Sequence, residues 1–204
     1  QEQTIQTRRE GDIVASLTLE TKKDILRDFL LEAADDDFLK WLEGNGYFTA
    51  PASKSHHGSE EGALYEHSLQ VAYELISLTE KLGLKWQRKN SPQIIGMLHD
   101  VCKMDDYLIR EEVIGATIDG GKIYGNPQVE WNKERIWPGH GEKSLIMLMG
   151  HISLTEEEKM CIRYHMGSFT DSKEWEFYSR AVKIYPNVLY THMADMIASQ
   201  IKGV

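Results

Sequence analysis

Apolar residues recur at intervals of three and four positions along most of the chain, which predicts a largely helical protein. The first such pattern extends from Lys22 until Gly44-Asn45-Gly46 interrupts it. A long amphipathic pattern over about 64–82 ends at Gly83. Residues 48–62, between these two patterns, are rich in Ser, His, Gly and Pro, and we expect a loop there.

The second half of the chain predicts further helices with recognisable ends. Ser91-Pro92 is typical of a helix start, and the helix it opens carries His99 and Asp100. The helical pattern resumes after Gly139-His140-Gly141. Thr155 to Glu158 have capping-box spacing, which marks a helix that runs to His165. A final helix is expected over about 188–201.

Residues 107–136 do not follow the helical period. Apolar residues such as Val113, Ile118 and Ile123 are interleaved there with Gly120-Gly121 and with Gly125-Asn126-Pro127. This pattern predicts a small β-hairpin insertion. We therefore expect an all-α helical bundle that carries one hairpin, with a polar N-terminal arm over 1–20 and a single domain over 21–204.

Composition narrows the possible partners. A chain of 204 residues with 41% hydrophobic residues suits one globular domain. No apolar run approaches the ~18 residues of a membrane span, so no membrane partner is expected. The net charge of −9 argues against stable nucleic-acid binding. Cys102 and Cys161 form no CxxC pair, which favours reduced thiols in a cytoplasmic protein.

The most informative residues are His99 and Asp100, which are adjacent within an otherwise apolar run. An imidazole and a carboxylate are costly to bury unless something binds them, and both are good ligands for a divalent metal. His67 lies on the apolar face of the 64–82 helix, and Asp195 lies in the last helix. Each alone is more often a hydrogen-bonded core residue than a ligand.

Taken together, these four residues from three helices could surround one octahedral metal and leave two positions for water or substrate. His140, between two glycines, and His165, at a helix end, are either surface residues or ligands of a second metal that Asp100 would bridge. Paired metals suit displacement reactions at phosphorus. The donor types do not choose among Mn, Fe, Mg, Co, Ni and Zn.

This order of ligands resembles the HD-domain superfamily of metal-dependent phosphohydrolases. The resemblance consists of His67, then His99-Asp100, then the distant Asp195, with Lys103 three residues after the first Asp. It covers about 48–198. It implies an all-helical fold and a phosphohydrolase that uses a metal-activated hydroxide on a nucleotide or another small phosphoester.

The resemblance also suggests roles for individual residues. Asp100 and Lys103 are the expected catalytic residues, and Lys103 would neutralise a phosphoryl oxygen or pair with a site carboxylate. The candidates for binding the substrate are His56, His57 and Lys143. For the two histidines, the alternative is that they are ordinary surface residues of a loop. We interpret Cys102 as a small core residue rather than a ligand.

Two other classes of function remain compatible with these residues. Some members of the superfamily use a di-iron pair to oxidise C–H bonds, and the six potential ligands permit such an oxygenase. A non-catalytic nucleotide-binding module is the third hypothesis. Oxygen consumption would identify the oxygenase, and ligand binding without turnover would identify the binding module.

Overall fold

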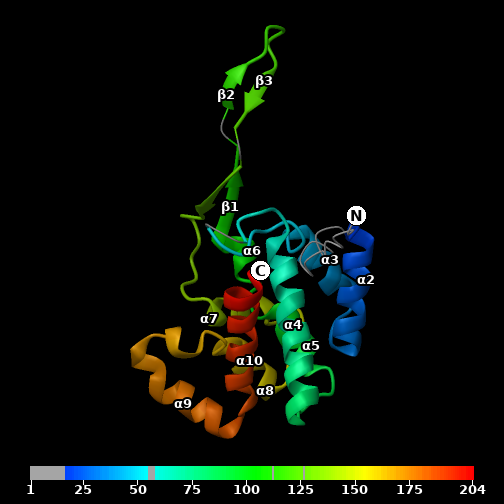
Figure 1. Cartoon of the computed structure of the whole chain (residues 1–204), viewed down its shortest axis with the longest axis vertical. Helices are drawn as coiled ribbons and strands as arrows, with labels where there is room; N and C mark the ends of the chain where they lie inside the picture. Colours follow the sequence, from blue (N-terminus) through cyan, green and yellow to red (C-terminus); the bar gives the residue numbers. More distant parts are fainter. Residues whose placement is uncertain (1–16, 55–57, 112, 126) are drawn as a thin grey trace, which may run out of the picture.

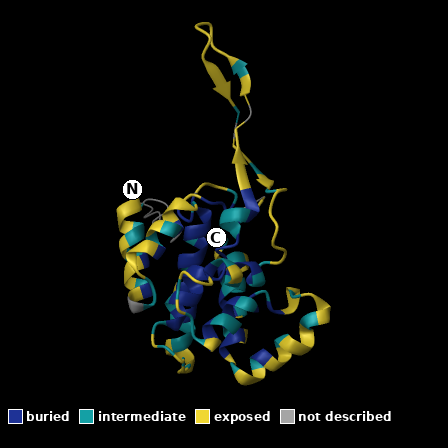
Figure 2. Ribbon diagram, turned by 180° about the vertical axis from the view of Figure 1, so that it is seen from behind, coloured by how far each residue is buried: buried dark blue, intermediate teal, exposed yellow. Residues whose placement is uncertain are grey.

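The computed structural model describes residues 17–54, 58–111, 113–125 and 127–204. It is mostly helical, and a β-hairpin projects from one end of the helical body (Figure 1). Buried residues concentrate in the helical body, whereas the outer part of the hairpin is largely exposed (Figure 2). The predicted fold class, helical with a hairpin insertion, is confirmed at this level.

The predicted first helical run is in fact two helices, α2 (Leu19–Leu30) and α3 (Asp36–Gly44), with a 3-10 turn between them. The break has a local cause, because the Asp35 carboxylate accepts a hydrogen bond from the Phe38 N–H at 2.8 Å and starts α3 afresh. Thr18 caps α2 in the same way. Helix α2 therefore begins inside the segment 1–20 that we assigned to an arm, and residues 1–16 lie outside the described part.

Helices α4 (Ala63–Leu82) and α5 (Ser91–Leu98) form the centre of the core. They approach each other closely at Gly96, where an added Cβ would lie 2.3 Å from the Ala72 Cα. The predicted bounds of α4 are confirmed to within one residue. Helix α5 is shorter than predicted, because it ends at Leu98, so that His99 is its C-cap residue and Asp100 lies in the following turn.

The remaining helices pack around this pair. The predicted capping box is present, because the Thr155 hydroxyl accepts from the Glu158 N–H and the Glu158 carboxylate accepts from the Thr155 N–H. Helix α10 contacts both α4 and α8, and a π-helical segment η4 continues it toward the C-terminus. The elements are α6 (Lys103–Asp106), α7 (Gly141–Leu148), α8 (Glu156–Arg163), η2 (Gly167–Phe169), η3 (Ser172–Glu174), α9 (Trp175–Ile184), α10 (Asn187–Met196) and η4 (Ile197–Lys202).

The predicted hairpin consists of two successive antiparallel pairs. Strand β1 (Tyr107–Arg110) pairs with β4 (Gln128–Trp131), and β2 (Val113–Ala116) pairs with β3 (Lys122–Tyr124) farther out. Tyr107 at the base is buried against the helical body. None of the helices in the described part of the chain has both the length and the apolar composition that a membrane span requires.

Candidate metal centre

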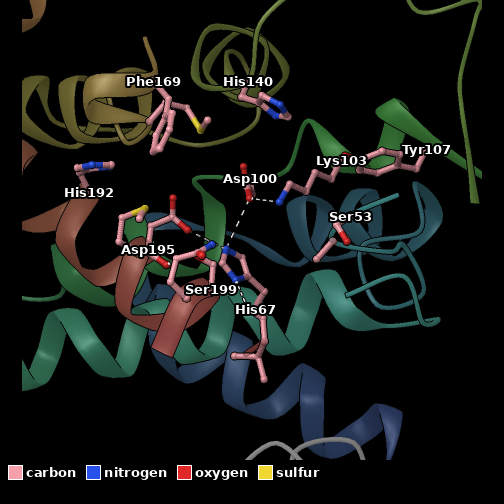
Figure 3. A pocket seen from close by; sticks show the side chains of 15 residues that line it. Ser53, His67, Asp100, Lys103, Tyr107, His140, Phe169, His192, Asp195 and Ser199 are labelled. Atoms are coloured by element: carbon pink, nitrogen blue, oxygen red, sulfur yellow. Dashed lines mark hydrogen bonds and ion pairs between the residues drawn. The ribbon is translucent and has the colours of Figure 1, made fainter. Parts of the chain in front are cut away.

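Five of the predicted ligands meet in the helical body. His67 comes from α4, His99 and Asp100 from the turn after α5, His165 from the turn after α8, and Asp195 from α10. The side chains of His67, Asp100 and Asp195 point toward a common space in Figure 3. The potential ligand atoms of His67, His99 and Asp100 lie within 4.8 Å of one another, as do those of His99, His165 and Asp195.

The three imidazoles in this cluster have the same orientation. The Nδ1 atoms of His67, His99 and His165 lie 2.9, 2.9 and 2.8 Å from backbone carbonyl oxygens. A carbonyl oxygen only accepts hydrogen bonds, so each Nδ1 carries the proton and each Nε2 presents a lone pair to the cluster. Histidine ligands of metals are typically held in this way by a hydrogen bond from the other ring nitrogen.

Two features of the cluster fit a bound cation. The Nε2 atoms of His67 and His99 are only 3.3 Å apart, which places two lone pairs face to face. The Nε2 of His165 is buried and has no hydrogen-bond partner in the described part of the chain. A buried acceptor without a partner is costly, and a metal ion would satisfy all three nitrogens. The residues present therefore fit a metal ion.

The ionisation of the cluster also suits a metal. Burial lowers the pKa of His99 to about 4, so this imidazole is neutral at neutral pH. Burial alone would raise the pKa of Asp100, but Lys103 and the neighbouring histidines outweigh it and hold this pKa well below its usual range. Burial is likewise outweighed at Asp195, mainly by its contact with the His67 imidazole, and its pKa falls to about 2. A neutral imidazole, as at His99, and ionised carboxylates are the forms that bind metals. At His165, burial acts to lower the pKa, but the Asp100 carboxylate outweighs burial and raises the pKa above its usual value.

The two oxygens of the Asp100 carboxylate face different neighbours. Its Oδ2 lies 2.6 Å from the Lys103 Nζ, 3.5 Å from the His99 Nε2 and 3.7 Å from the His67 Nε2. Its Oδ1 lies 3.3 Å from the His165 Nε2. A carboxylate with this orientation can serve two cations at once, which is the arrangement that a bridging ligand requires.

His140 lies at the edge of this cluster, at the N-cap of α7. It groups with Asp100 and Cys102, with potential ligand atoms within 4.8 Å of one another. Gly141 makes this placement possible, because an added Cβ would lie 2.2 Å from the Arg163 carbonyl oxygen, where α8 ends. The close contact brings His140 and the His165 turn to the same side of the body, but His165 groups with His99 and Asp195 rather than with His140.

A cavity of about 620 Å³ opens over these residues. Polar side chains form much of its lining (Figure 3), namely His67, Asp100, Lys103, His140 and Asp195 together with Ser53, His192, Ser199 and Gln200. Less polar side chains line other parts of the wall, namely Tyr107, Met166, Phe169 and Met196.

The predicted substrate-binding residues have different outcomes. Lys143 does not reach the cavity lining: its ammonium is buried and lies 2.6 Å from Asp105 Oδ2 and 2.7 Å from Asp106 Oδ1. This double ion pair gives Lys143 a structural role in place of the phosphate contact we expected. His56 and His57 lie outside the described residues.

The sequence does not predict the contact made by one further residue of the cavity lining, His192. His192 on α10 donates from Nδ1 to the His165 carbonyl at 2.9 Å and so ties the turn that carries His165 to α10. Gly167 makes room for its ring, because an added Cβ there would lie 2.4 Å from the ring carbons. A glycine two residues after a histidine was the available signal, but it did not identify the partner.

Comparison with protein-family models, with curated proteins and with solved structures finds no match to this chain. The functional assignment therefore depends on the geometry and chemistry of the site.

Proposed function

We propose that this protein is a metal-dependent phosphohydrolase of the HD-domain type, acting on a nucleotide or another small phosphoester. The observation that carries the proposal is the convergence of three buried imidazole Nε2 atoms and two ionised carboxylates beside a cavity that His67, Asp100 and Asp195 line. The order of these donors along the chain, His67, His99-Asp100 and Asp195, is the order that the superfamily resemblance implies.

The ligands proposed for the first metal are His67, His99, Asp100 and Asp195, with His165 close enough to join them. A divalent metal bound here would lower the pKa of a coordinated water and neutralise charge on phosphoryl oxygens. The protein contributes the rest of the site. Its backbone carbonyls fix the imidazole rings, so the donor atoms need little rearrangement to bind a metal.

Lys103 has two roles in this proposal. Burial acts to lower its pKa, but the Asp100 carboxylate at 2.6 Å outweighs burial and raises the pKa above its usual value, so the ammonium stays charged. It holds Asp100 in one orientation through this contact. Because Lys103 also lines the cavity, its remaining N–H groups are available to a phosphoryl oxygen of the substrate.

The size and lining of the cavity favour a small substrate. A volume of about 620 Å³ falls within the ~300–1,000 Å³ typical of small-molecule sites. Phe169, Met166 and Met196 offer a less polar surface beside the charged residues, which suits a nucleobase or another flat apolar group. The net charge of −9 disfavours a long polyanionic substrate, because such binding depends on basic surface.

The direct test is phosphate release by protein that has been stripped with a chelator and reloaded with Mn²⁺, Fe²⁺, Mg²⁺, Co²⁺, Ni²⁺ or Zn²⁺. We expect hydrolysis of at least one member of a panel of nucleotides and simple phosphoesters, dependent on the added metal. Absence of hydrolysis with every metal, in protein that binds metal, would contradict the proposal. Oxygen uptake by the iron-loaded protein would identify an oxygenase instead.

A pair of histidine variants controls for folding. His67→Ala removes a proposed ligand, whereas His151→Ala removes an exposed histidine that stacks on Trp41 outside the cluster. We expect the first variant to lose metal and turnover and the second to keep both. Equal loss in the two variants would mean that the effect reflects stability rather than coordination.

A further inference from the structure

Cys102 is a buried thiol that the proposed function does not use. It lies in the turn that follows α5, two residues after Asp100. Its backbone N–H donates to the Ser144 hydroxyl at 3.2 Å, which ties this turn to α7. Because His140 is the N-cap residue of α7, this tie brings the two side chains together, with the Cys102 Sγ 3.6 Å from the His140 Nδ1.

The separation between this sulfur and this nitrogen matches that of two ligands on one metal ion. Zinc binds thiolate sulfur at about 2.3 Å and imidazole nitrogen at about 2.0–2.1 Å in a tetrahedron, which places the two donor atoms about 3.6 Å apart. The observed separation is 3.6 Å. An Asp100 oxygen lies within 4.8 Å of both atoms, so a small movement of side chains completes a three-ligand set.

A second observation points to a cation on this side of Asp100. The Oδ1 of Asp100 faces the His165 Nε2 at 3.3 Å, and that nitrogen is buried without a hydrogen-bond partner among the described residues. The Oδ2 of this carboxylate is directed to His67, His99 and Lys103, whereas its Oδ1 faces the His165 imidazole. The two oxygens therefore point to different sides, and one of them is available to a second cation.

We propose that a second metal ion binds to Asp100, the Cys102 sulfur and the His140 Nδ1, beside the five-residue centre. The proposal rests on the proposed function only through Asp100, which both metals would share. Asp106 is the nearest competitor for His140, but its Oδ2 is 3.9 Å from that Nδ1 and its Oδ1 is engaged by Lys143 at 2.7 Å. The Cys102 sulfur is therefore closer to the His140 Nδ1 than the Asp106 Oδ2 is.

A sulfur ligand would change which metal this site accepts. Thiolate is a soft ligand that favours zinc, cobalt or iron, whereas magnesium and calcium favour oxygen ligands. Coordination replaces the thiol proton, which leaves to the solvent, so no oxidant or other reactant is required. Three protein ligands leave a fourth position open, and Asp100 and His140 both line the cavity from which substrate would approach.

The test is the absorption spectrum of the whole protein titrated with Co²⁺ in thiol-free buffer. We expect a near-ultraviolet thiolate-to-cobalt charge-transfer band in the wild type and in Cys161→Ser, whose buried thiol belongs to none of the potential metal groups of the described chain. Cys102→Ser is expected to lose this band and one bound cobalt ion, while retaining the weaker visible bands of cobalt in the His67 centre. A cobalt-loaded wild type without the band, or a band that persists in Cys102→Ser, would overturn the proposal.

X-ray absorption of the zinc-loaded wild type tests for a sulfur ligand without the need for a variant whose folding must be checked. We expect a sulfur neighbour of zinc at about 2.3 Å. Nitrogen and oxygen neighbours alone would overturn the Cys102 ligand and leave the proposed hydrolase unaffected. Conversely, a sulfur neighbour in protein that hydrolyses no phosphoester would support this site and contradict the proposed function.

Discussion

The helical body and the projecting hairpin use their apolar residues in opposite ways. In the body, Leu64 and Ile94 are fully buried between helices, and the same packing sets the positions of the potential ligands. In the outer hairpin, Ile114 and Ile118 are 65% and 110% exposed, and β2 pairs with β3 alone. The potential metal ligands therefore come together where helices pack against one another, and the described residues of the outer hairpin contribute none of them.

The hairpin reaches the site only at its base. Tyr107, the first residue of β1, lines the cavity and packs against Trp131 in a tilted arrangement, with ring centroids 4.8 Å apart. Tyr124 lies on β3, in the outer pair of strands, and does not line this cavity. Changes in the body should therefore alter metal binding and stability strongly, whereas changes in the outer hairpin should alter them little.

The largest effect is expected from a ligand in the body. Asp195→Asn keeps the shape of the side chain but removes the charge that we propose binds a metal, and we expect kcat/KM for the phosphoester to fall at least about 100-fold. That bound follows because loss of a residue that merely orients a ligand already costs ~10–100-fold. Metal content and phosphate release measure the effect.

The matched hairpin variant is Glu130→Gln, which removes a carboxylate that pairs with Arg110 on the exposed strands. It should keep its metal content and activity. A comparable loss of activity in Glu130→Gln would show that the hairpin contributes to the site.

The next effect concerns the contact between α4 and α5. Gly96→Ala forces a methyl group against the Ala72 backbone, and we expect a loss of about 1–3 kcal/mol or more in the free energy of unfolding. Gly44→Ala is the control, because nothing lies within 4 Å of an added Cβ there. Urea denaturation of both variants measures the difference. Equal stability of the two variants would contradict the close contact.

A smaller effect is expected at the start of α8. Thr155→Ala removes the hydroxyl that accepts from the Glu158 N–H at 3.2 Å, and such losses cost about 1 kcal/mol. Thermal unfolding should show a modest fall in Tm at unchanged metal content. A loss of metal would mean that this cap also positions His165.

The smallest effect is expected at the tip of the hairpin. Ile118→Ser replaces an exposed side chain, and the stability should change by less than about 0.5 kcal/mol. Leu98→Ala in the body should cost about 2–5 kcal/mol by the same measurement, because Leu98 is fully buried. A large destabilisation by Ile118→Ser would show that the hairpin tip is covered in solution.

The sequence predicted features that depend on local pattern. The periodicity of apolar residues predicted α4, and the glycine-rich turn residues predicted the hairpin. The spacing of Thr155 and Glu158 predicted the capping box. The sequence also singled out His67, His99, Asp100 and Asp195 as potential ligands, because a polar residue of a type that can bind metal is visible on an apolar face without coordinates. These four residues do come together in the structure.

Features that depend on contacts between distant segments were not predictable. Lys143 faces Asp105 and Asp106, which are 38 and 37 positions away, and no spacing rule links them. The same reason applies to Cys102 and His140, which meet only because the turn after α5 packs on the start of α7. The break between α2 and α3 was missed for another reason: apolar residues on both sides of Asp35 continue at helical intervals.

Anomalous scattering from crystals of the metal-loaded protein, collected at the edge of the added metal, tests the central claim most directly. We expect a peak surrounded by His67, His99, Asp100 and Asp195, and a second peak beside Asp100 where Cys102 and His140 face each other. A metal-saturated protein with no peak within reach of His67, His99 and Asp195 would contradict the claim that this cluster is a metal centre.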